Sequence, residues 1–251
     1  MANPFSDTLV ERLAQARSVA VLTGAGISAE SGIRTFRDPD GHWEQYRPED
    51  LANPHAFRRN PHLVQRWYAT RIGRASDAAP NPGHYALVEL AKLVPEFTLV
   101  TQNVDNLHQR AGSTGVIELH GNITRQYCID CGTTAPPYDL AALNAGTIAT
   151  CHVCGGLVRP GVVWFTEALP DGALETGMEA ARACDVFLSI GTSAVVIPAA
   201  WIPLEATRAY TAEVNIARSA IADELDEVVL GPSGVVLPAL IAAVKTRLGV
   251  D

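Results

Sequence analysis

Four of the five cysteines are arranged as two close pairs that could hold a metal ion. Two residues separate Cys128 from Cys131, and after 19 further residues Cys151 and Cys154 repeat that spacing. Two such pairs at this separation are typical of a tetrahedral zinc site. Because four thiolates leave no open coordination position, we expect a structural zinc and not a catalytic one. The alternative is a nucleic-acid-binding ribbon, which the nearby Asp130 and the scarcity of basic residues disfavour.

A glycine-rich loop, GAGISAESG at residues 24–32, directly follows the apolar run at residues 19–22. Glycines after a buried strand let the backbone approach a pyrophosphate closely, and we expect the helix start that follows to offer unpaired N–H groups. The third glycine lies six residues after the second, and not three as in the common dehydrogenase fingerprint. The alternative is a tight turn that binds no ligand.

Polar side chains follow three other apolar runs of the chain. In an open parallel sheet, ligands bind outside the carboxyl ends of the strands, so these side chains should converge with the glycine loop. His120 is the natural general base among them, since an unperturbed histidine has a pKa near 6.5; the alternative is a structural histidine. The polar segments are residues 101–105, 120–122 and 191–193.

Strands that alternate with helices must position these groups, and they predict an α/β fold with a parallel sheet. A helix capped by Ser6 or Asp7 should come first, Asn81 should begin another helix with Pro82 at its first position, and the last should lie near residues 235–248. Two segments, residues 38–79 and 128–156, interrupt the alternation of strands and helices. They are interpreted as insertions that form a smaller domain. Cys184 is interpreted as core packing. The strands are expected at residues 19–22, 97–100, 116–119, 186–190, 210–214 and 228–230.

The bulk composition is that of a globular protein. The 251 residues are 47% hydrophobic and 18% charged. The net charge of −8 argues against direct nucleic-acid binding but allows a basic partner, such as a lysine-bearing peptide. We expect no membrane association, because no apolar run reaches about 18 residues. The first 15 residues do not read as a targeting signal, so a cytoplasmic location with reduced thiols is expected.

Together these segments resemble the sirtuin family over nearly the whole chain. The resemblance implies an enzyme, an NAD+-dependent protein deacylase that acts on acyl-lysine proteins or peptides. It also implies a Rossmann-like parallel sheet with helices on both faces and a smaller inserted zinc-binding domain. The large domain is expected at residues 1–37, 80–125 and 160–251, and the small domain as a helical insert at 38–79 with a zinc-binding module at 126–159. The motifs are GAGISAESGIRTFRD (24–38), TQNVDNLHQRAG (101–112), LHGN (119–122), GTSAVVIPA (191–199) and the four cysteines.

The resemblance further implies roles for single residues. The acyl oxygen attacks the ribose carbon as nicotinamide leaves, and His120 then helps to deprotonate a ribose hydroxyl, giving lysine, nicotinamide and O-acyl-ADP-ribose. The residues expected to bind NAD+ are Gly24, Ala25, Gly26 and Ser28 at the pyrophosphate, Phe36 and Arg37 on a covering loop, Gln102, Asn103 and Asp105 at the nicotinamide and its ribose, Gly191, Thr192 and Ser193 at the ribose and phosphate, and Asn215 and Ser233 near the adenosine.

The acyl group is suggested by Tyr68 and Arg71, which lie three apart on an expected helix and therefore share one face. The pair resembles the marker of desuccinylase-like (class III) sirtuins, in which it grips the carboxylate of a succinyl, malonyl or glutaryl group. Ala52 matches a small residue that leaves the pocket roomy. Acetyl removal should persist. The alternative is a surface arginine beside a core tyrosine.

Some residues depart from the family pattern, and other functions stay open. Thr166 stands where the family usually has glycine, in a segment expected to pair with the substrate backbone, and Val104 replaces a usual isoleucine. An ADP-ribosyltransferase would use the same pocket and label protein without acyl loss. A non-catalytic NAD+ or ADP-ribose sensor would tolerate His120→Ala. A dehydrogenase is disfavoured by the glycine spacing.

Overall fold

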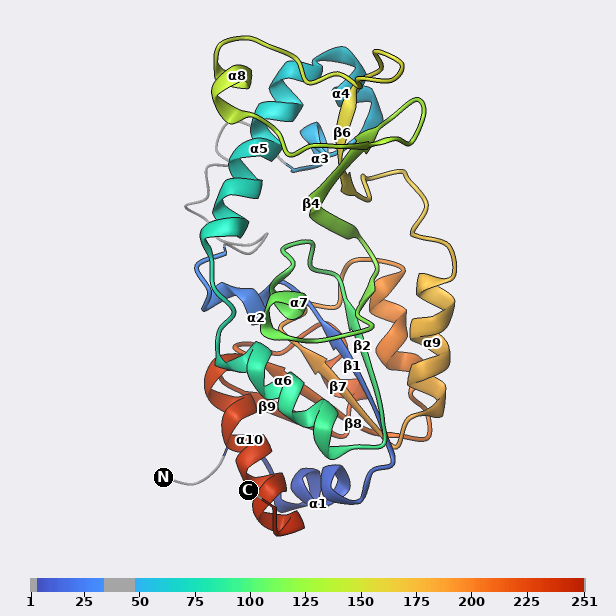
Figure 1. The fold of residues 1–251 in the computed structure, drawn as a ribbon. Helices are drawn as coiled ribbons and strands as arrows, with labels where there is room; N and C mark the ends of the chain where they lie inside the picture. The colour runs from blue at the N-terminus through green and yellow to red at the C-terminus, as the bar shows by residue number, and fades with distance from the viewer. Residues whose placement is uncertain (1–3, 34–47, 251) are drawn as a thin grey trace.

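The larger sheet has six parallel strands in the order β3-β2-β1-β7-β8-β9 (Figure 1). The computed structural model describes residues 4–33 and 48–250. When its six strands are numbered in the order in which they occur in the chain, the sheet has the Rossmann strand order. The strand order reverses between β1 and β7, which is where such sheets bind ligands. The strands are β1 (Ser18–Thr23), β2 (Glu96–Thr101), β3 (Ile117–Glu118), β7 (Val186–Ile190), β8 (Tyr210–Asn215) and β9 (Glu227–Leu230).

Helices cover both faces of this sheet because its central strands are apolar on both sides. Successive side chains of a strand point to opposite faces, so Val19 and Val21 pack in one core while Ala20 and Leu22 pack in the other. The first core includes α1, α6 and α10, and the second includes α9 and η2; Figure 1 shows the two sets on opposite sides of the sheet. Their bounds are α1 (Asp7–Gln15), α6 (Pro82–Leu93), α9 (Ala173–Ala183), η2 (Ala199–Glu205) and α10 (Ser233–Leu248).

Two of the expected helix starts are formed by their predicted caps. The Ser6 hydroxyl accepts the backbone N–H of Leu9 at 3.1 Å, so Ser6 and not Asp7 caps α1. The Asn81 side chain accepts the backbone N–H of Gly83 at 2.9 Å, with Pro82 at the first helical position of α6. Each cap satisfies a donor that has no partner inside the helix.

A second, antiparallel sheet in the order β5-β4-β6 lies above the first in Figure 1. It packs with helices from the segment before α6, and their shared core contains Phe57, Tyr68 and Trp164. The elements of this part are α3 (Pro48–Leu51), α4 (Pro54–Arg59), α5 (Pro61–Asp77), β4 (Gly121–Cys128), β5 (Thr134–Ala135), α8 (Leu140–Asn144) and β6 (Val158–Val162).

The sequence predicted the α/β class and the strands of the parallel sheet correctly, although β3 is only Ile117–Glu118 and not residues 116–119. It did not predict β4 or β6. These strands extend across the expected domain limits at 125/126 and 159/160, and the division into domains stays a prediction. Among the helices described, none is long and apolar enough to span a membrane.

Candidate functional site at the carboxyl edge of the parallel sheet

The glycine loop after β1 packs directly against the loop after β7. The backbone N–H of Gly26 donates to the carbonyl oxygen of Gly191 at 2.7 Å. A Cβ on Gly24 would lie 2.7 Å from the Thr192 Cβ, and one on Gly26 would lie 2.7 Å from the Gly191 Cα. Any side chain would force the two loops apart, so glycine is required by the close approach of two backbones. The loop therefore leaves a bare main-chain surface at the point where the strand order reverses.

The short helix α2 (Gly26–Ala29) does not present the free N–H groups that the sequence suggested. The N–H groups of Gly26, Ile27 and Ser28 donate to the carbonyl oxygens of Gly191, Gly24 and Ala25. The expectation of unpaired donors at this helix start was therefore wrong for these residues. Carbonyl oxygens of the turn and of Gly191 already accept these N–H groups. The loop therefore contributes its shape and its close approach to the loop after β7.

Gln102, which follows β2, and Asn215, at the end of β8, converge on Thr192. The Gln102 side-chain amide donates to the Thr192 hydroxyl at 3.0 Å, and the Asn215 amide donates to the Thr192 carbonyl at 2.9 Å. The predicted residues after β2, β7 and β8 are thus joined into one hydrogen-bonded edge. Ser193 lies beside Thr192 and accepts the Ala220 N–H at 3.1 Å through its carbonyl.

Ser28 is the centre of a buried polar network. Its hydroxyl donates to the Asp105 carboxylate at 2.7 Å, and the Asn103 amide donates both to that hydroxyl at 3.2 Å and to the Gly24 carbonyl at 3.0 Å. The backbone N–H of Leu107, the first residue of α7 (Leu107–Ala111), donates to the other Asp105 oxygen at 2.9 Å. Burial raises the pKa of Asp105, although these bonds act against the shift.

His84 extends this network, and its tautomer follows from its partners. The Asn81 backbone N–H donates to His84 Nδ1 at 3.3 Å, so Nδ1 carries no proton and Nε2 does. Nε2 faces the Ser28 hydroxyl at 3.5 Å. Burial lowers the pKa of His84 to about 4, which keeps the ring neutral near pH 7.

His108 lies next to this ring and is also buried. The two ring centroids are 4.9 Å apart, and His108 Nε2 lies 2.9 Å from the Thr23 hydroxyl, which donates to Thr101 at 2.8 Å. Burial first, and His84 second, lower the pKa of His108 to about 3. His84 and His108 are therefore both neutral near pH 7.

His120 follows β3 and reaches the same edge. Its Nδ1 lies 2.9 Å from the Gln102 carbonyl oxygen, which only accepts hydrogen bonds, so Nδ1 carries the proton. Nε2 then holds a lone pair. Burial lowers the pKa of His120, and the bond to Gln102 opposes this shift. The ring is thus a neutral imidazole with a basic nitrogen, as a general base requires.

The part of the molecule that contains the antiparallel sheet contacts this edge at His120. The His120 carbonyl accepts the Val163 N–H at 2.9 Å, directly before Trp164. Two residues later, the Phe165 N–H donates to the carbonyl of Ala52 at 2.9 Å. These bonds connect the imidazole to the core that contains Ala52 and Tyr68.

Tyr68 and Arg71 lie on α5, where Tyr68 is buried and Arg71 is partly buried. Tyr68 is 4% exposed, and its hydroxyl oxygen accepts the indole N–H of Trp164 at 2.9 Å. Burial raises the pKa of Tyr68 to about 12, while the charge of Arg71 acts in the opposite direction. The pKa of Arg71 is lowered, first by burial, and its guanidinium lies 4.8 Å from the Trp67 ring centroid. The buried Tyr68 and the partly buried Arg71 thus lie on one face of α5.

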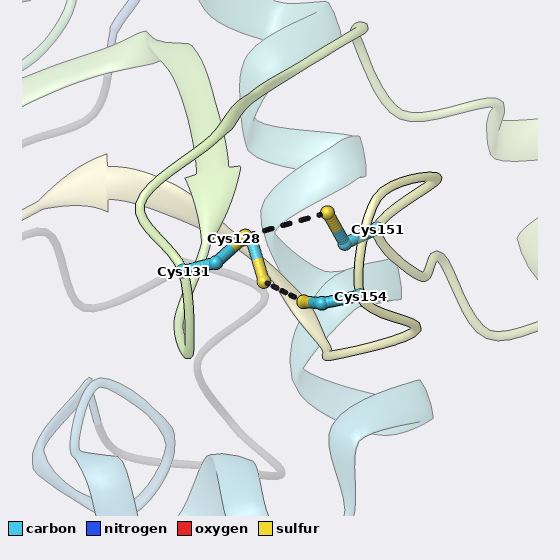
Figure 2. Close-up of side chains that lie close together, drawn as sticks. All are labelled: Cys128, Cys131, Cys151 and Cys154. Atoms are coloured by element: carbon cyan, nitrogen blue, oxygen red, sulfur yellow. Dashed lines mark hydrogen bonds between the residues drawn. The ribbon is translucent and has the colours of Figure 1, made fainter.

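The four predicted cysteines form one cluster. Figure 2 shows their side chains converging, and all four sulfur atoms lie within 4.8 Å of one another. The contacts are 3.5 Å for Cys128–Cys154 and 3.7 Å for Cys131–Cys151. Four sulfurs at about 2.3 Å from a tetrahedral ion would be about 3.8 Å apart. The donor set and spacing therefore fit a closed, structural zinc site.

Three of the sequence-predicted residues stand apart from these contacts. Phe36 and Arg37 lie outside the described residues. Ser233 is buried at the start of α10, and a Cβ on Gly83 would lie 3.2 Å from its carbonyl oxygen. Cys184 is buried beside α9, and its thiol donates to the Ala181 carbonyl at 3.2 Å, as expected for a core residue.

Sequence reasoning missed three side chains that shape the site. His84 lies at the third position of α6, and its contact with the distant Ser28 is what places it at the site. His108 lies on α7, where its sequence position alone does not show that it is buried beside His84. The bond of Trp164 to Tyr68 joins residues 96 positions apart, and no local pattern predicts such a contact.

A model of the Sir2 family matches residues 24–198 of the chain. Two similar proteins carry the name NAD-dependent protein deacylase. That of Pyrobaculum aerophilum, numbered 2, is 49% identical over 242 residues, which are 96% of this chain and 96% of the relative. That of Aquifex aeolicus is 50% identical over 200 residues, which are 79% of this chain and 83% of the relative.

Solved structures of similar proteins contain the dinucleotide. The fold matches a complex of a Sir2 homologue with NAD with a TM-score of 0.91 and 40% identity, covering 98% of this chain and 96% of the other. It matches a complex of Sir2 with a p53 peptide and NAD+ with a TM-score of 0.82 and 30% identity, covering 98% and 99%.

Proposed function

Because this chain belongs to the Sir2 family and is an NAD-dependent protein deacylase, we propose that it prefers acyl-lysines whose acyl group ends in a carboxylate. Succinyl, malonyl and glutaryl groups are the proposed substrates, and acetyl groups are removed as well. One solvent water is consumed, and the products are the free lysine, nicotinamide and O-acyl-ADP-ribose.

The observation that carries this proposal is that a partly buried guanidinium and a buried phenol lie three residues apart on α5 and so share one helix face. A carboxylate that arrives beside Arg71 would gain a charge-assisted hydrogen bond. Tyr68 keeps its proton, because burial raises its pKa to about 12, so its hydroxyl is available as a donor. An acetyl methyl group could use neither the charge nor the donor.

The proposed base is His120. Support comes from its Nδ1–H bond to Gln102, which leaves Nε2 free to take a proton from a ribose hydroxyl. The lowered pKa favours the neutral ring. The bond from Val163 to the His120 carbonyl fixes the imidazole relative to the acyl pocket.

The proposed NAD+ contacts follow the arrangement of the edge. Gly24, Ala25, Gly26 and Ser28 would lie along the pyrophosphate, because dinucleotides approach the loop after the first strand of such sheets closely. Gln102, Asn103 and Asp105 would hold the nicotinamide and its ribose, because the amide of Asn103 and the carboxylate of Asp105 complement a carboxamide. Gly191, Thr192 and Ser193 would face the ribose and phosphate, and Asn215 and Ser233 the adenosine. The dinucleotide supplies an electrophilic ribose carbon and a leaving group.

The peptide is proposed to bind along residues 162–167. Phe165 is exposed in this segment, next to Trp164 at the acyl pocket. A similar Sir2 structure contains a p53 peptide. An extended peptide would gain main-chain hydrogen bonds there in the manner of an added strand.

Arg71→Met tests the acyl preference, with Arg66→Met on the exposed face of the same helix as the matched control. Succinyl- and acetyl-lysine peptides of one sequence are compared by kcat/KM, with products identified by mass spectrometry. Loss of a charge-assisted contact should lower the succinyl-to-acetyl ratio about 10- to 100-fold in Arg71→Met. The ratio should stay constant in Arg66→Met. Unchanged rates on both peptides in Arg71→Met would exclude this pocket.

A further inference from the structure

Trp164 makes a contact with Tyr68 that determines the direction of the tyrosine hydroxyl. The indole nitrogen can only donate a hydrogen bond, so the Tyr68 oxygen is the acceptor of the 2.9 Å contact. The proton of the Tyr68 hydroxyl is not used in that bond. Among the hydrogen bonds of the described residues, the Tyr68 hydroxyl takes part in this one, in which its oxygen accepts. The hydroxyl is therefore left as a donor toward whatever enters beside Arg71.

The indole is itself held from several sides. The backbone N–H of Trp164 donates to a Glu167 carboxylate oxygen at 2.8 Å. The Arg159 guanidinium lies 3.6 Å from the centroid of the indole ring. Arg159 is buried and pairs with both Glu167 oxygens at 2.5 and 2.8 Å. The Phe57 ring packs at 5.0 Å between centroids. A side chain fixed in this way holds its N–H in one place, whereas a residue that only fills the core needs no donor there.

We propose that Trp164 is a positioning residue for acyl selectivity: its indole N–H occupies the Tyr68 oxygen and so commits the Tyr68 hydroxyl proton to the carboxylate of an acidic acyl group. This inference rests on the proposed preference for such groups. It adds a residue outside α5 to the recognition of the acyl tail, and it gives the Arg159–Glu167 pair a role in holding the indole.

The test is the succinyl-to-acetyl ratio of kcat/KM in Trp164→Phe, Tyr68→Phe and the double variant. Removing one neutral hydrogen bond should lower the ratio about 3- to 10-fold in Trp164→Phe. In the Tyr68→Phe background, Trp164→Phe should lower it no further, because the partner is already gone. Trp201→Phe, at an exposed tryptophan, is the matched control and should leave the ratio unchanged.

The possible outcomes separate this inference from the proposal beneath it. If Trp164→Phe lowers both rates equally, Trp164 is merely structural and the inference is wrong. If Tyr68→Phe lowers the ratio while Trp164→Phe does not, the acidic-acyl preference stands and the inference fails. If Tyr68→Phe and Arg71→Met both leave the ratio unchanged, the acidic-acyl proposal fails and the inference fails with it.

A second substitution covers the case in which Trp164→Phe does not fold. The side chain of 3-benzothienylalanine has nearly the shape of indole but carries sulfur in place of the N–H. Incorporated at position 164, it should keep the thermal unfolding midpoint near that of the unsubstituted protein and still lower the ratio. A ratio equal to that of the unsubstituted protein would overturn the role of the N–H.

Discussion

At the scale of single residues, the hydrogen bond at one ring nitrogen of His120 determines that the other nitrogen holds the lone pair. The Gln102 carbonyl fixes the proton on Nδ1, and burial disfavours a second proton on Nε2. The same reasoning applies to His84, whose Nδ1 is fixed as an acceptor by Asn81. The hydrogen-bond partner sets which nitrogen is basic, and burial sets the pH range in which it stays so.

The pH profile of the reaction should reflect this burial. Because the pKa of His120 is lowered from its ordinary value of 6.5, the ring stays in its basic form as pH falls below 6.5. The acid limb of kcat/KM for a fixed peptide should therefore lie below pH 6.5, and His120→Ala should lower kcat at least about 100-fold. An acid limb above pH 6.5 would contradict the assignment, and His55→Ala, at an exposed histidine, serves as the control.

At the scale of elements, the turn after β6 carries a residue that its geometry disfavours. The Glu167 N–H donates to the Trp164 carbonyl at 3.0 Å, and Thr166, the third residue of this turn, has φ of +76°. Branched side chains rarely adopt this conformation, which glycine adopts freely. The usual glycine of the family at this position thus has a physical reason, and threonine stores strain there.

Thr166→Gly should relieve this strain. The greater entropy of glycine in the unfolded chain cancels part of the gain. The net increase in the free energy of unfolding should be about 1 kcal/mol, or about 2–4 °C in Tm. Thr147→Gly, at an exposed threonine outside the positive-φ residues, should destabilise instead. Thermal unfolding by circular dichroism measures both. An equal decrease in Tm in Thr166→Gly and Thr147→Gly would show that Thr166 is not strained.

The cysteine cluster should hold the antiparallel sheet together, since it joins the end of β4 to the loop before β6. We expect one zinc per chain by elemental analysis. Cys151→Ser should lose most of it, lower Tm and reduce activity, because β4 begins directly after His120. Cys184→Ser, at the core cysteine, should retain the metal. Full zinc content in Cys151→Ser would contradict the four-cysteine site.

The same elements show what sequence alone could predict. β1 and β7 are mostly apolar along their length, so their place in a buried parallel sheet could be predicted from the sequence. β6 contains Arg159 and Pro160 and reads as a loop, yet Arg159 is buried, because Glu167 and Trp164 surround it. Such burial depends on contacts between segments, which periodicity does not encode. The roles of the predicted site residues remain proposals for the same reason.

At the scale of the whole molecule, two neutral histidines are buried where the helices α6 and α7 meet the glycine loop. The pKa values of His84 and His108 are lowered to about 4 and about 3, against 6.5 when unfolded. The unfolded chain therefore binds protons first as pH falls below 6.5, and stability is lost progressively down to about pH 3–4. Asp105 acts in the opposite direction, because burial raises its pKa.

Urea unfolding at pH 7 and pH 4.5 should reveal this loss. Each histidine should contribute on the order of 2–3 kcal/mol to the difference between the two pH values. His84→Gln should reduce the difference, whereas His55→Gln, at an exposed position, should not. A free energy of unfolding that rises on acidification from pH 7 would contradict the buried neutral rings.

The central claim is that a nucleotide edge and a carboxylate-binding acyl pocket meet at His120. A competition measures it most directly: succinyl- and acetyl-lysine versions of one peptide, at equal concentration in one reaction with NAD+, are followed by mass spectrometry from the first turnovers. The ratio of the two initial losses equals the ratio of kcat/KM. We predict faster loss of the succinyl peptide with matching formation of O-succinyl-ADP-ribose. Equal or faster loss of the acetyl peptide would contradict it.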